Sequence, residues 1–468
     1  MSTDCELSSN GKVFKKYLGT DSEFTIPDGV KTIGTEAFKN CATLKSIVIP
    51  DGVKTIGWGA FYGCKSLKSI ELPDSVNEIR TVAFCGCSAL TSIAVPRRVK
   101  TIWEKAFYGC SSLKSIILPE SLKVIGASAF YGCSSLTSIV VPDSVRKIAE
   151  RAFDRCSSLT SVFIPKRVKK IGLGAFGGCP SLKSFEVDEN NRNYRSDDGV
   201  LFSKDGKTLV KVPGGASLET FFVSNEIKKI RRDAFYACRS LQSIDVAEDN
   251  LNYRSIDGVL FSKDGKELVE FPEGMKIERF PVAEDVKLAS FGACPSLEFV
   301  DVAENNPRYR SVDGVLFSKN EKSLIKFPGG MKKESFVVPE SVEEIADEAF
   351  ADCSSLTSII IPGTVNGIGW EAFRSCSSLE SVVVQEGVES IGPLAFADCP
   401  ALKSVVLPKS VEFFGGCAFW DEDGECVELE FVGEGVFYGC EALTIRAPKG
   451  SPAERYAREC GLDFEPVE

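Results

Sequence analysis

Apolar residues recur along most of this chain in blocks of 23 residues. The block Val30–Pro50, VKTIGTEAFKNCATLKSIVIP, returns almost unchanged as VKTIGWGAFYGCKSLKSIELP at Val53–Pro73. In its second half, Leu44, Ile47 and Ile49 alternate with Ser and charged residues, which predicts a strand with one buried face. A Val-x-x-Ile pair near the start of each block predicts a second short strand. The Ala-Phe dipeptide that follows predicts a helical turn that buries Phe and Cys.

A cysteine three residues after the phenylalanine marks the period. It recurs every 23 residues at Cys41, Cys64, Cys87, Cys110, Cys133, Cys156 and Cys179, and again at Cys353, Cys376 and Cys399. A fixed period of 20–29 residues with an L-x-x-I-x-I core is typical of leucine-rich-repeat solenoids. We therefore expect a β-rich (α/β) repeat solenoid with a parallel strand ladder and short helical turns.

Changes in this rhythm divide the expected solenoid into five parts. Cysteines 179, 238, 294 and 353 are 59, 56 and 59 residues apart, so the repeats between them are enlarged. The expected parts of one continuous solenoid are an N-terminal cap (1–29), regular repeats (30–187), enlarged repeats (188–340), regular and then irregular repeats (341–448) and a C-terminal capping helix (449–468).

The enlarged repeats carry a second motif in three copies, of which NYRSDDGVLFSKDGKTLVKVP is the first. Two β runs flank Asp205-Gly206 and Asp264-Gly265, a strong hairpin signal. Asp198-Gly199 and its two counterparts are also typical of turns. The third copy has Asn320-Glu321 at the loop. Because Glu tolerates positive φ poorly, we expect a looser turn, or one of another type, there.

The last residues predict a helix with both ends marked. Ser451 is the expected N-cap, with Pro452 at the first helical position and Glu454 completing a capping box. Gly461 is the expected stop. An apolar stripe at i, i+3, i+4 and i+7 would close the last repeat: Ala453, Tyr456, Ala457 and Cys460.

Three motifs together carry a specific resemblance. They are the unit I-G-x-x-A-F-x-x-C-x-x-L-x-x-I-x-I-P, the N-x-x-Y-x-S-x-D-G-V-L-F-S-K-D-G hairpins and the terminal G-S-P-A-E-R-Y-A segment. Over nearly the whole chain the sequence resembles the BspA-like leucine-rich-repeat family. The resemblance implies a right-handed solenoid. It also implies a binding protein without a shared catalytic residue set, associated with bacterial and protozoan cell surfaces and with adhesion.

Composition narrows the function classes. The formal net charge is −11, the sequence pI is near 5.0, and histidine is absent. An acidic chain without a long Lys/Arg run argues against nucleic acid as a partner. The lack of histidine removes Ser-His-Asp and Cys-His nucleophile systems and His-containing zinc sites. No apolar run reaches about 18 residues, so no membrane span is expected.

The N-terminal residues MSTDCELSSNGKVFKK lack the apolar segment of a secretory signal. This favours a cytoplasmic location if Met1 is the native start. The family resemblance implies the cell surface instead, so both locations stay open.

The 18 cysteines could form a metal or disulfide site, but a simpler interpretation is available. No C-x-x-C pair occurs, and stacked cysteines have parallel Cβ vectors that suit neither a zinc tetrahedron nor an S–S torsion. We expect buried, reduced thiols that pack as small apolar groups. Cys5, Cys85, Cys417 and Cys426 lie off the period, and Cys85 is a candidate exposed thiol.

Two further motifs are weak. Gly172–Gly177 matches G-x-G-x-x-G, but equivalent positions elsewhere carry large side chains and no βαβ unit follows, so we interpret it as repeat variation around a tight turn. Asp421–Glu425 gathers acidic side chains that could hold calcium, but it lacks the loop spacing of a calcium site. A solvated acidic turn is the simpler interpretation.

The outward side of the strand ladder is the expected binding surface. Five residues after each repeat cysteine stands a serine, and Phe299 breaks this line. Two residues further on, apolar side chains flank an acidic middle, and such exposed apolar rows are typical of binding surfaces. High β-propensity at tolerant positions is the alternative. The candidate residues are Ile117, Val140, Phe163, Phe299, Ile360, Val383 and Val406.

We therefore expect a non-enzymatic binding or adhesion protein that presents this surface to a protein or glycan partner at a cell surface. The alternative is a cytosolic protein–protein interaction scaffold. We expect no catalytic residues, no cofactor, no metal and no nucleic acid partner.

Overall fold

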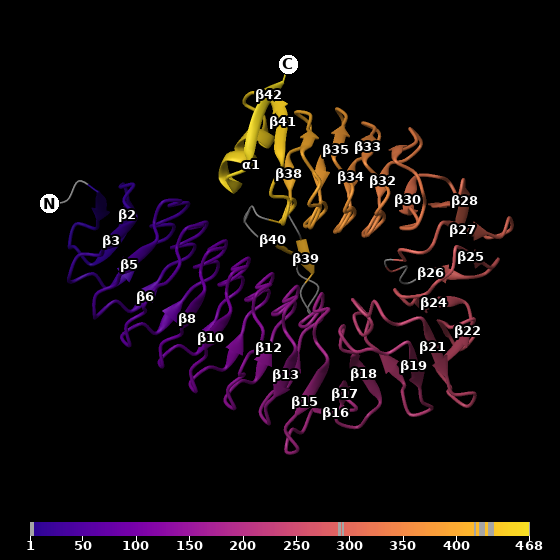
Figure 1. Ribbon diagram of the computed structural model, residues 1–468, viewed down its shortest axis with the longest axis horizontal. Helices are drawn as coiled ribbons and strands as arrows, with labels where there is room; N and C mark the ends of the chain where they lie inside the picture. The colour runs from indigo at the N-terminus through magenta and orange to yellow at the C-terminus, as the bar shows by residue number, and fades with distance from the viewer. Residues whose placement is uncertain are drawn as a thin grey trace. The chain divides into compact units, whose positions relative to one another are not determined.

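The computed structural model describes residues 4–288, 292, 294–415, 418–420, 426–428 and 435–467, the side chains of 418–420 and 426–428 excepted. Two compact units make up the chain. Unit 1 comprises Met1–Leu241 with Val246–Asn252, and unit 2 comprises Gln242–Asp245 with Tyr253–Glu468. In each, short strands stack side by side in successive turns (Figure 1). Each unit is described by itself.

Unit 1 contains two strand ladders on different sides of its turns. The first ladder is formed by the Leu-x-x-Ile-x-Ile segments: β3 (Glu23–Thr25), β5 (Ser46–Val48), β8 (Ser92–Ala94), β10 (Ser115–Ile117), β13 (Ser161–Ile164), β15 (Ser184–Val187) and β19 (Thr220–Val223). The second ladder is a nine-stranded sheet: β1 (Cys5–Leu7), β2 (Val13–Tyr17), β4 (Thr32–Ile33), β6 (Thr55–Ile56), β7 (Glu78–Ile79), β9 (Thr101–Ile102), β11 (Val124–Ile125), β12 (Lys147–Ile148) and β14 (Lys170–Ile171).

The repeat period sets the register of both ladders. Ser115 pairs with Ser92 in the first ladder, and Ile125 pairs with Ile148 in the second, so residues 23 apart become neighbours. Apart from the antiparallel pair β1–β2, the ladder strands are parallel. The expected parallel ladder is therefore present.

The segment expected to be a helical turn is instead a series of hydrogen-bonded turns. The N–H of Phe61 donates to the carbonyl of Ala83 in the next repeat (2.8 Å), not to a residue four positions earlier. Residues such as Val82 and Lys105 have φ near +51°, and this left-handed conformation breaks a helix. Interior N–H groups thus bond between repeats, which ties neighbouring turns together.

Phenylalanine and cysteine fill the core with repeating contacts. Rings of successive repeats stack nearly parallel with centroids 5.1–5.5 Å apart from Phe38 to Phe176. Each ladder thiol from Cys64 to Cys179 contacts the phenylalanine carbonyl of the preceding repeat, as Cys64 Sγ does with Phe38 O at 3.0 Å. A buried thiol therefore supplies both a small apolar volume and a weak donor.

Each enlarged repeat inserts a three-stranded antiparallel unit. In unit 1 it is β16 (Tyr194–Asp197), β17 (Val200–Ser203) and β18 (Thr208–Lys211), followed by β20 (Lys229–Ile230). In unit 2 the two copies are β22 (Tyr253–Ile256), β23 (Val259–Ser262) and β24 (Glu267–Glu270), and β28 (Tyr309–Val312), β29 (Val315–Ser318) and β30 (Ser323–Lys326). The three predicted hairpin units are thus present.

The expectation of a different turn in the third copy is wrong. Glu321 adopts φ +60° and its N–H donates to Ser318 O, as Gly206 and Gly265 do in the other copies. Its carboxylate pairs with Arg310 at 2.5 Å. This pairing helps to hold a conformation that glutamate alone disfavours.

Unit 2 repeats the two-ladder arrangement. Its first ladder contains β25 (Arg279–Val282) paired with β27 (Phe299–Val302), and a six-stranded sheet of β31 (Ser335–Val337), β33 (Ser358–Ile361), β35 (Ser381–Val384), β37 (Ser404–Val406), β41 (Thr444–Pro448) and β42 (Asp463–Val467). The second ladder of unit 2 continues from the hairpin units: β24 pairs with β26 (Lys287–Leu288), and β30 pairs with β32 (Glu344–Ile345), which is followed by β34 (Gly367–Ile368), β36 (Ser390–Ile391) and β38 (Phe413–Phe414). The remaining strands are β21 (Ser243–Val246, the first three residues in this unit) and the antiparallel pair β39 (Ala418–Trp420) and β40 (Cys426–Glu428).

The predicted C-terminal helix is α1 (Pro452–Cys460), which lies beside β41 and β42 (Figure 1). Ser451 Oγ accepts the N–H of Glu454, and Gly461 ends the helix in the left-handed conformation at φ 63°. The four residues of the predicted stripe are buried. The strand that follows, β42, pairs parallel with β41 and was not part of the sequence expectation.

Candidate binding surfaces

In unit 1 the first ladder turns a row of apolar side chains toward solvent. Ile117 is 69% exposed, Val140 80% and Phe163 43%. Ile117 pairs with Ala94, and the bridge between Ile139 and Val162 places Val140 beside Phe163. The alternate residues of these strands point inward and are buried. The sequence-based inward and outward assignment therefore agrees with the structure here.

In unit 2 the register joins four exposed or half-buried apolar residues into one line. Val337, Ile360, Val383 and Val406 are paired across β31, β33, β35 and β37. Val337 is 61% exposed, Ile360 and Val383 are each 37% exposed, and Val406 is half-buried. The next two positions are Arg446 and Glu465, which form an ion pair at 3.1 Å. The apolar row thus ends at a charged pair.

Phe299 differs from the other candidates. It is half-buried, and the Arg279 guanidinium lies 4.3 Å from its ring centroid. Arg279 also pairs with Asp301 at 3.2 Å. The ring is therefore shielded by a neighbouring cation within unit 2 and is set among charged groups rather than in an apolar row.

Two outward apolar residues were missed by counting from the repeat cysteines. Phe222 in β19 and Val337 in β31 are each 61% exposed. Both strands follow hairpin units, so no ladder cysteine stands five residues before them. The alternation in TFFV and SFVV was the available signal.

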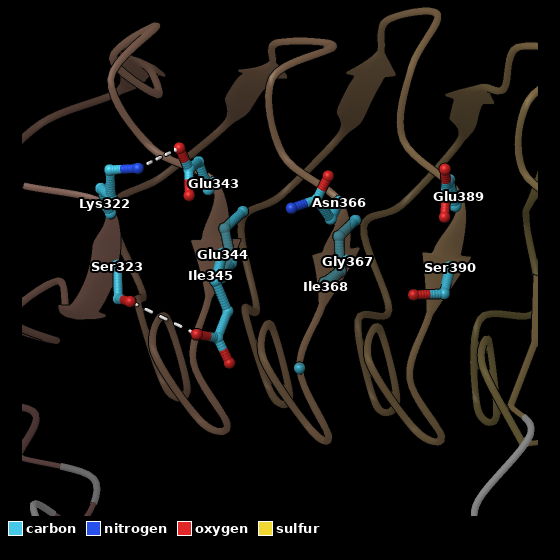
Figure 2. Close-up of a pocket in the computed structure, with 11 residues that line it drawn as sticks. Lys322, Ser323, Glu343, Glu344, Ile345, Asn366, Gly367, Ile368, Glu389 and Ser390 are labelled. Atoms are coloured by element: carbon cyan, nitrogen blue, oxygen red, sulfur yellow. Dashed lines mark hydrogen bonds and ion pairs between the residues drawn. The ribbon is translucent and has the colours of Figure 1, made fainter.

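A shallow groove of about 470 Å³ lies over the second ladder of unit 2. Figure 2 shows polar side chains along it, with Gly367 among the lining residues. Lys322 pairs with Glu343 at 2.7 Å, and Ser323 Oγ donates to Glu344 at 3.3 Å. Glu389 and Asn366 line the same groove. The groove is polar and acidic, and it was not predicted from the sequence.

The described cysteines are free thiols, and most are buried. Cys85 is among the buried ones, at 1% exposure, so its candidacy as an exposed thiol is wrong. It occupies the position of Tyr62 and Tyr108 in the neighbouring repeats, and both of these are buried. Burial raises the pKa of Cys41 and of Cys179 to about 12, which keeps both thiols protonated and poorly nucleophilic at neutral pH. Cys417 and the side chain of Cys426 lie outside the described residues.

The two weak motifs provide no site geometry. Gly172–Gly177 lies in the turns after β14, and no helix follows that could receive a phosphate. Asp421–Glu425 lies outside the described residues. Among the side chains that the structure describes, no three His, Cys, Asp or Glu residues converge as metal ligands would.

Comparison with protein families matches a model described as the BspA type leucine-rich repeat region, in six copies. The matched residues are 10–102, 79–197, 214–333 and 326–444. A search of curated proteins returns no significant relative. In the described part of the chain, no helix has the length and apolar character needed to cross a membrane.

Several solved structures resemble this chain. A leucine-rich cell surface protein from Faecalibacterium prausnitzii is 27% identical over 82% of this chain and 94% of its own, with a TM-score of 0.50. A leucine-rich repeat protein from T. pallidum is 35% identical over 39% of this chain and 89% of its own (TM-score 0.37). One from Bacteroides ovatus is 24% identical over 98% and 94% (TM-score 0.41).

The family match covers most of the repeats, and the first of these structures agrees with it along the greater part of both chains. The fold described above, with its parallel ladders and inserted hairpin units, is a leucine-rich-repeat solenoid. The chain therefore belongs to the BspA type leucine-rich-repeat family.

Proposed function

We propose that this chain is a non-enzymatic binding protein whose partner, a protein or a glycan, docks on the outward face of the first ladder. The observation that carries the proposal is the uninterrupted apolar row in each unit. In unit 2 the register joins Val337, Ile360, Val383 and Val406 across four adjacent strands. Such a row costs hydration free energy while it is exposed, and burial against a partner recovers it.

Adhesion at a cell surface is the form of binding that we favour. The support is the similarity to a protein described as a leucine-rich cell surface protein. A cytosolic interaction scaffold is the second candidate, and it is favoured by the many free thiols of the described residues, because reduced cysteines are the rule in the cytosol. Protease treatment of intact producing cells, followed by blotting of surface and cytosolic fractions, separates the two. Loss of the protein supports adhesion, whereas full protection with recovery in the soluble fraction supports the scaffold.

The surface itself is tested by a charge placed in each row. We expect Phe163→Asp or Val383→Asp to abolish binding to whichever matrix protein or surface glycan the native chain captures in an array. Because both side chains are substantially exposed, the melting temperature should change little.

Leu173→Asp is the matched control for the first variant. Leu173 is 43% exposed, as is Phe163, but it lies in a turn outside the first ladder. Its variant should bind as the native chain does. Undiminished binding by both row variants would show that the partner docks elsewhere.

A further inference from the structure

The residue directly before each second-ladder strand of unit 1 is nearly always a cation. This ladder has eight parallel strands, from β2 to β14, and therefore eight such positions. We name the following residues the cation row: Lys12, Lys31, Lys54, Lys100, Lys123, Arg146 and Lys169, with Asn77 at the remaining position. All seven cations are exposed except Lys123, which is half-buried.

Backbone hydrogen bonds make these residues spatial neighbours. The N–H of Lys54 donates to Lys31 O at 2.8 Å, and that of Asn77 to Lys54 O at 2.9 Å. Further along, Arg146 N–H donates to Lys123 O, also at 2.8 Å. Adjacent parallel strands lie ~4.8 Å apart. Cations separated by 23 residues in sequence therefore form one row with about one cation per strand, interrupted at Asn77.

The row is not neutralised by ion pairs. Across residues 4–288, none of its seven side chains forms a salt bridge, although other cations of unit 1 do, such as Arg97 with Asp74 and Lys166 with Asp143. Acidic residues stand three positions before several row members. Asp143, before Arg146, is engaged by Lys166. The other three are exposed and form no salt bridge with the row: Asp28, Asp51 and Glu120. Like charges about one strand apart repel one another, and a bound anion would relieve that repulsion.

The fold does not require a cation at this position. In unit 2 the same register joins Glu343, Asn366, Glu389 and Glu412, as shown by the N–H of Asn366 donating to Glu343 O at 2.8 Å. Three of these four line the groove of Figure 2. Both charge signs are thus compatible with the same backbone. The cations of unit 1 are therefore not explained by the needs of the fold.

We propose that the cation row binds a linear acidic polysaccharide, a chain of sugars with regularly spaced sulfate or carboxylate groups. A row composed mainly of flexible lysine point charges suits an extended polyanion whose charges recur along its length. Single-stranded nucleic acid is disfavoured, because its binding sites stack bases on aromatic side chains. The row residues and the residues directly after them, such as Thr55 and Thr101, include no aromatic residue.

A second copy of the chain is the other possible occupant, through its acidic row. That row offers only three carboxylates against seven cations, and Glu343 is already paired with Lys322. The polysaccharide is therefore the better match. This site lies on the second ladder and does not depend on the apolar rows of the first. Either proposal can therefore be refuted while the other stands.

The test is calorimetric titration of the full chain with a heparin oligosaccharide at low salt. The row variant replaces Lys54, Lys100, Lys123 and Arg146 with Gln. The matched control replaces four exposed lysines of the first-ladder side with Gln: Lys45, Lys68, Lys114 and Lys183. Both variants lose four positive charges. We expect the row variant to lose about tenfold or more in affinity and to show a shallower salt dependence, because fewer counterions are exchanged. The control should stay close to the native chain.

Four outcomes would overturn the proposal. The first is absence of heparin binding by the native chain, and the second is equal loss in both variants, which would indicate attraction by net charge alone. The third is a single-stranded oligonucleotide that binds the native chain, in the same titration, as tightly as the heparin oligosaccharide does. A low-salt dimer in sedimentation that the row variant abolishes would assign the row to a second copy instead. Neutral dextran serves as the negative ligand.

Discussion

At the residue scale, the inward and outward positions of each strand are separated sharply. Leu136 is fully buried, whereas Val140, four residues later, is 80% exposed. Inward positions follow from the sequence because alternation with polar residues can be satisfied only by burying the apolar side. The candidate residues on the outward side were located in the same way.

Truncation of an inward leucine should be costly. We expect Leu136→Ala to lower the free energy of unfolding by ~2–5 kcal/mol, because the surrounding repeats cannot close the cavity completely. Val140→Ala, in the same repeat, should cost under ~0.5 kcal/mol, since its side chain contacts mainly water. Chemical denaturation of both variants provides the measurement. Equal costs would contradict the register described above.

Residue-level prediction failed where a contact beyond the local segment decides. Cys85 lies off the 23-residue period, yet it is buried because Tyr62 and Tyr108 occupy the same interior position above and below. Glu321 takes a conformation that its side chain disfavours, with Arg310 beside it. In both cases the decisive contact comes from residues distant in sequence.

At the element scale, the cysteine ladder behaves as a line of buried acids. From Cys64 to Cys179, each thiol contacts a phenylalanine carbonyl of the preceding repeat, as Cys179 does with Phe153 O at 3.2 Å. Burial is the main cause of the raised pKa of Cys41 and Cys179, about 12 in each, against an ordinary value of 9.0. The thiols are therefore kept neutral in the folded chain.

This has a consequence for alkaline stability. The folded-state pKa is raised, so the unfolded chain releases thiol protons first, and stability falls as the pH rises from about 9 to about 12. We expect urea unfolding between pH 7 and 11 to show a constant stability up to about pH 8 and a steep loss above pH 9. In Cys179→Ala the loss should be shallower by up to ~1.4 kcal/mol per pH unit. An unchanged slope would show that this thiol ionises equally in both states.

At the scale of the whole molecule, charge is divided unequally between the units. Unit 1 has 35 basic and 26 acidic residues, a formal net charge of +9, whereas unit 2 has 20 basic and 40 acidic residues, a net charge of −20. These values together give the −11 of the full chain. The negative net charge of the full chain therefore comes from unit 2, whereas unit 1 is basic.

The imbalance should make unit 2 the more salt-sensitive part. Self-repulsion among like charges destabilises a folded unit, and salt screens it. We expect hydrogen exchange of the full chain to slow more in the second ladder of unit 2, around Glu343 and Glu389, than around Lys54 and Lys123 when salt is raised from low to physiological concentration. A uniform response would show that local pairing outweighs net charge.

The sequence by itself determined the solenoid, its hairpin units, the buried cysteines and the outward apolar positions, because a strict period and a one-sided alternation can be buried in only one way. Only the tertiary structure decided which residues become neighbours on the surface. The sequence contains no long run of lysines, yet stacking places Lys31 beside Lys54 and Lys100 beside Lys123. The physical reason is that a turn of 23 residues advances the ladder by a single strand spacing, which turns an isolated residue in each repeat into a continuous row.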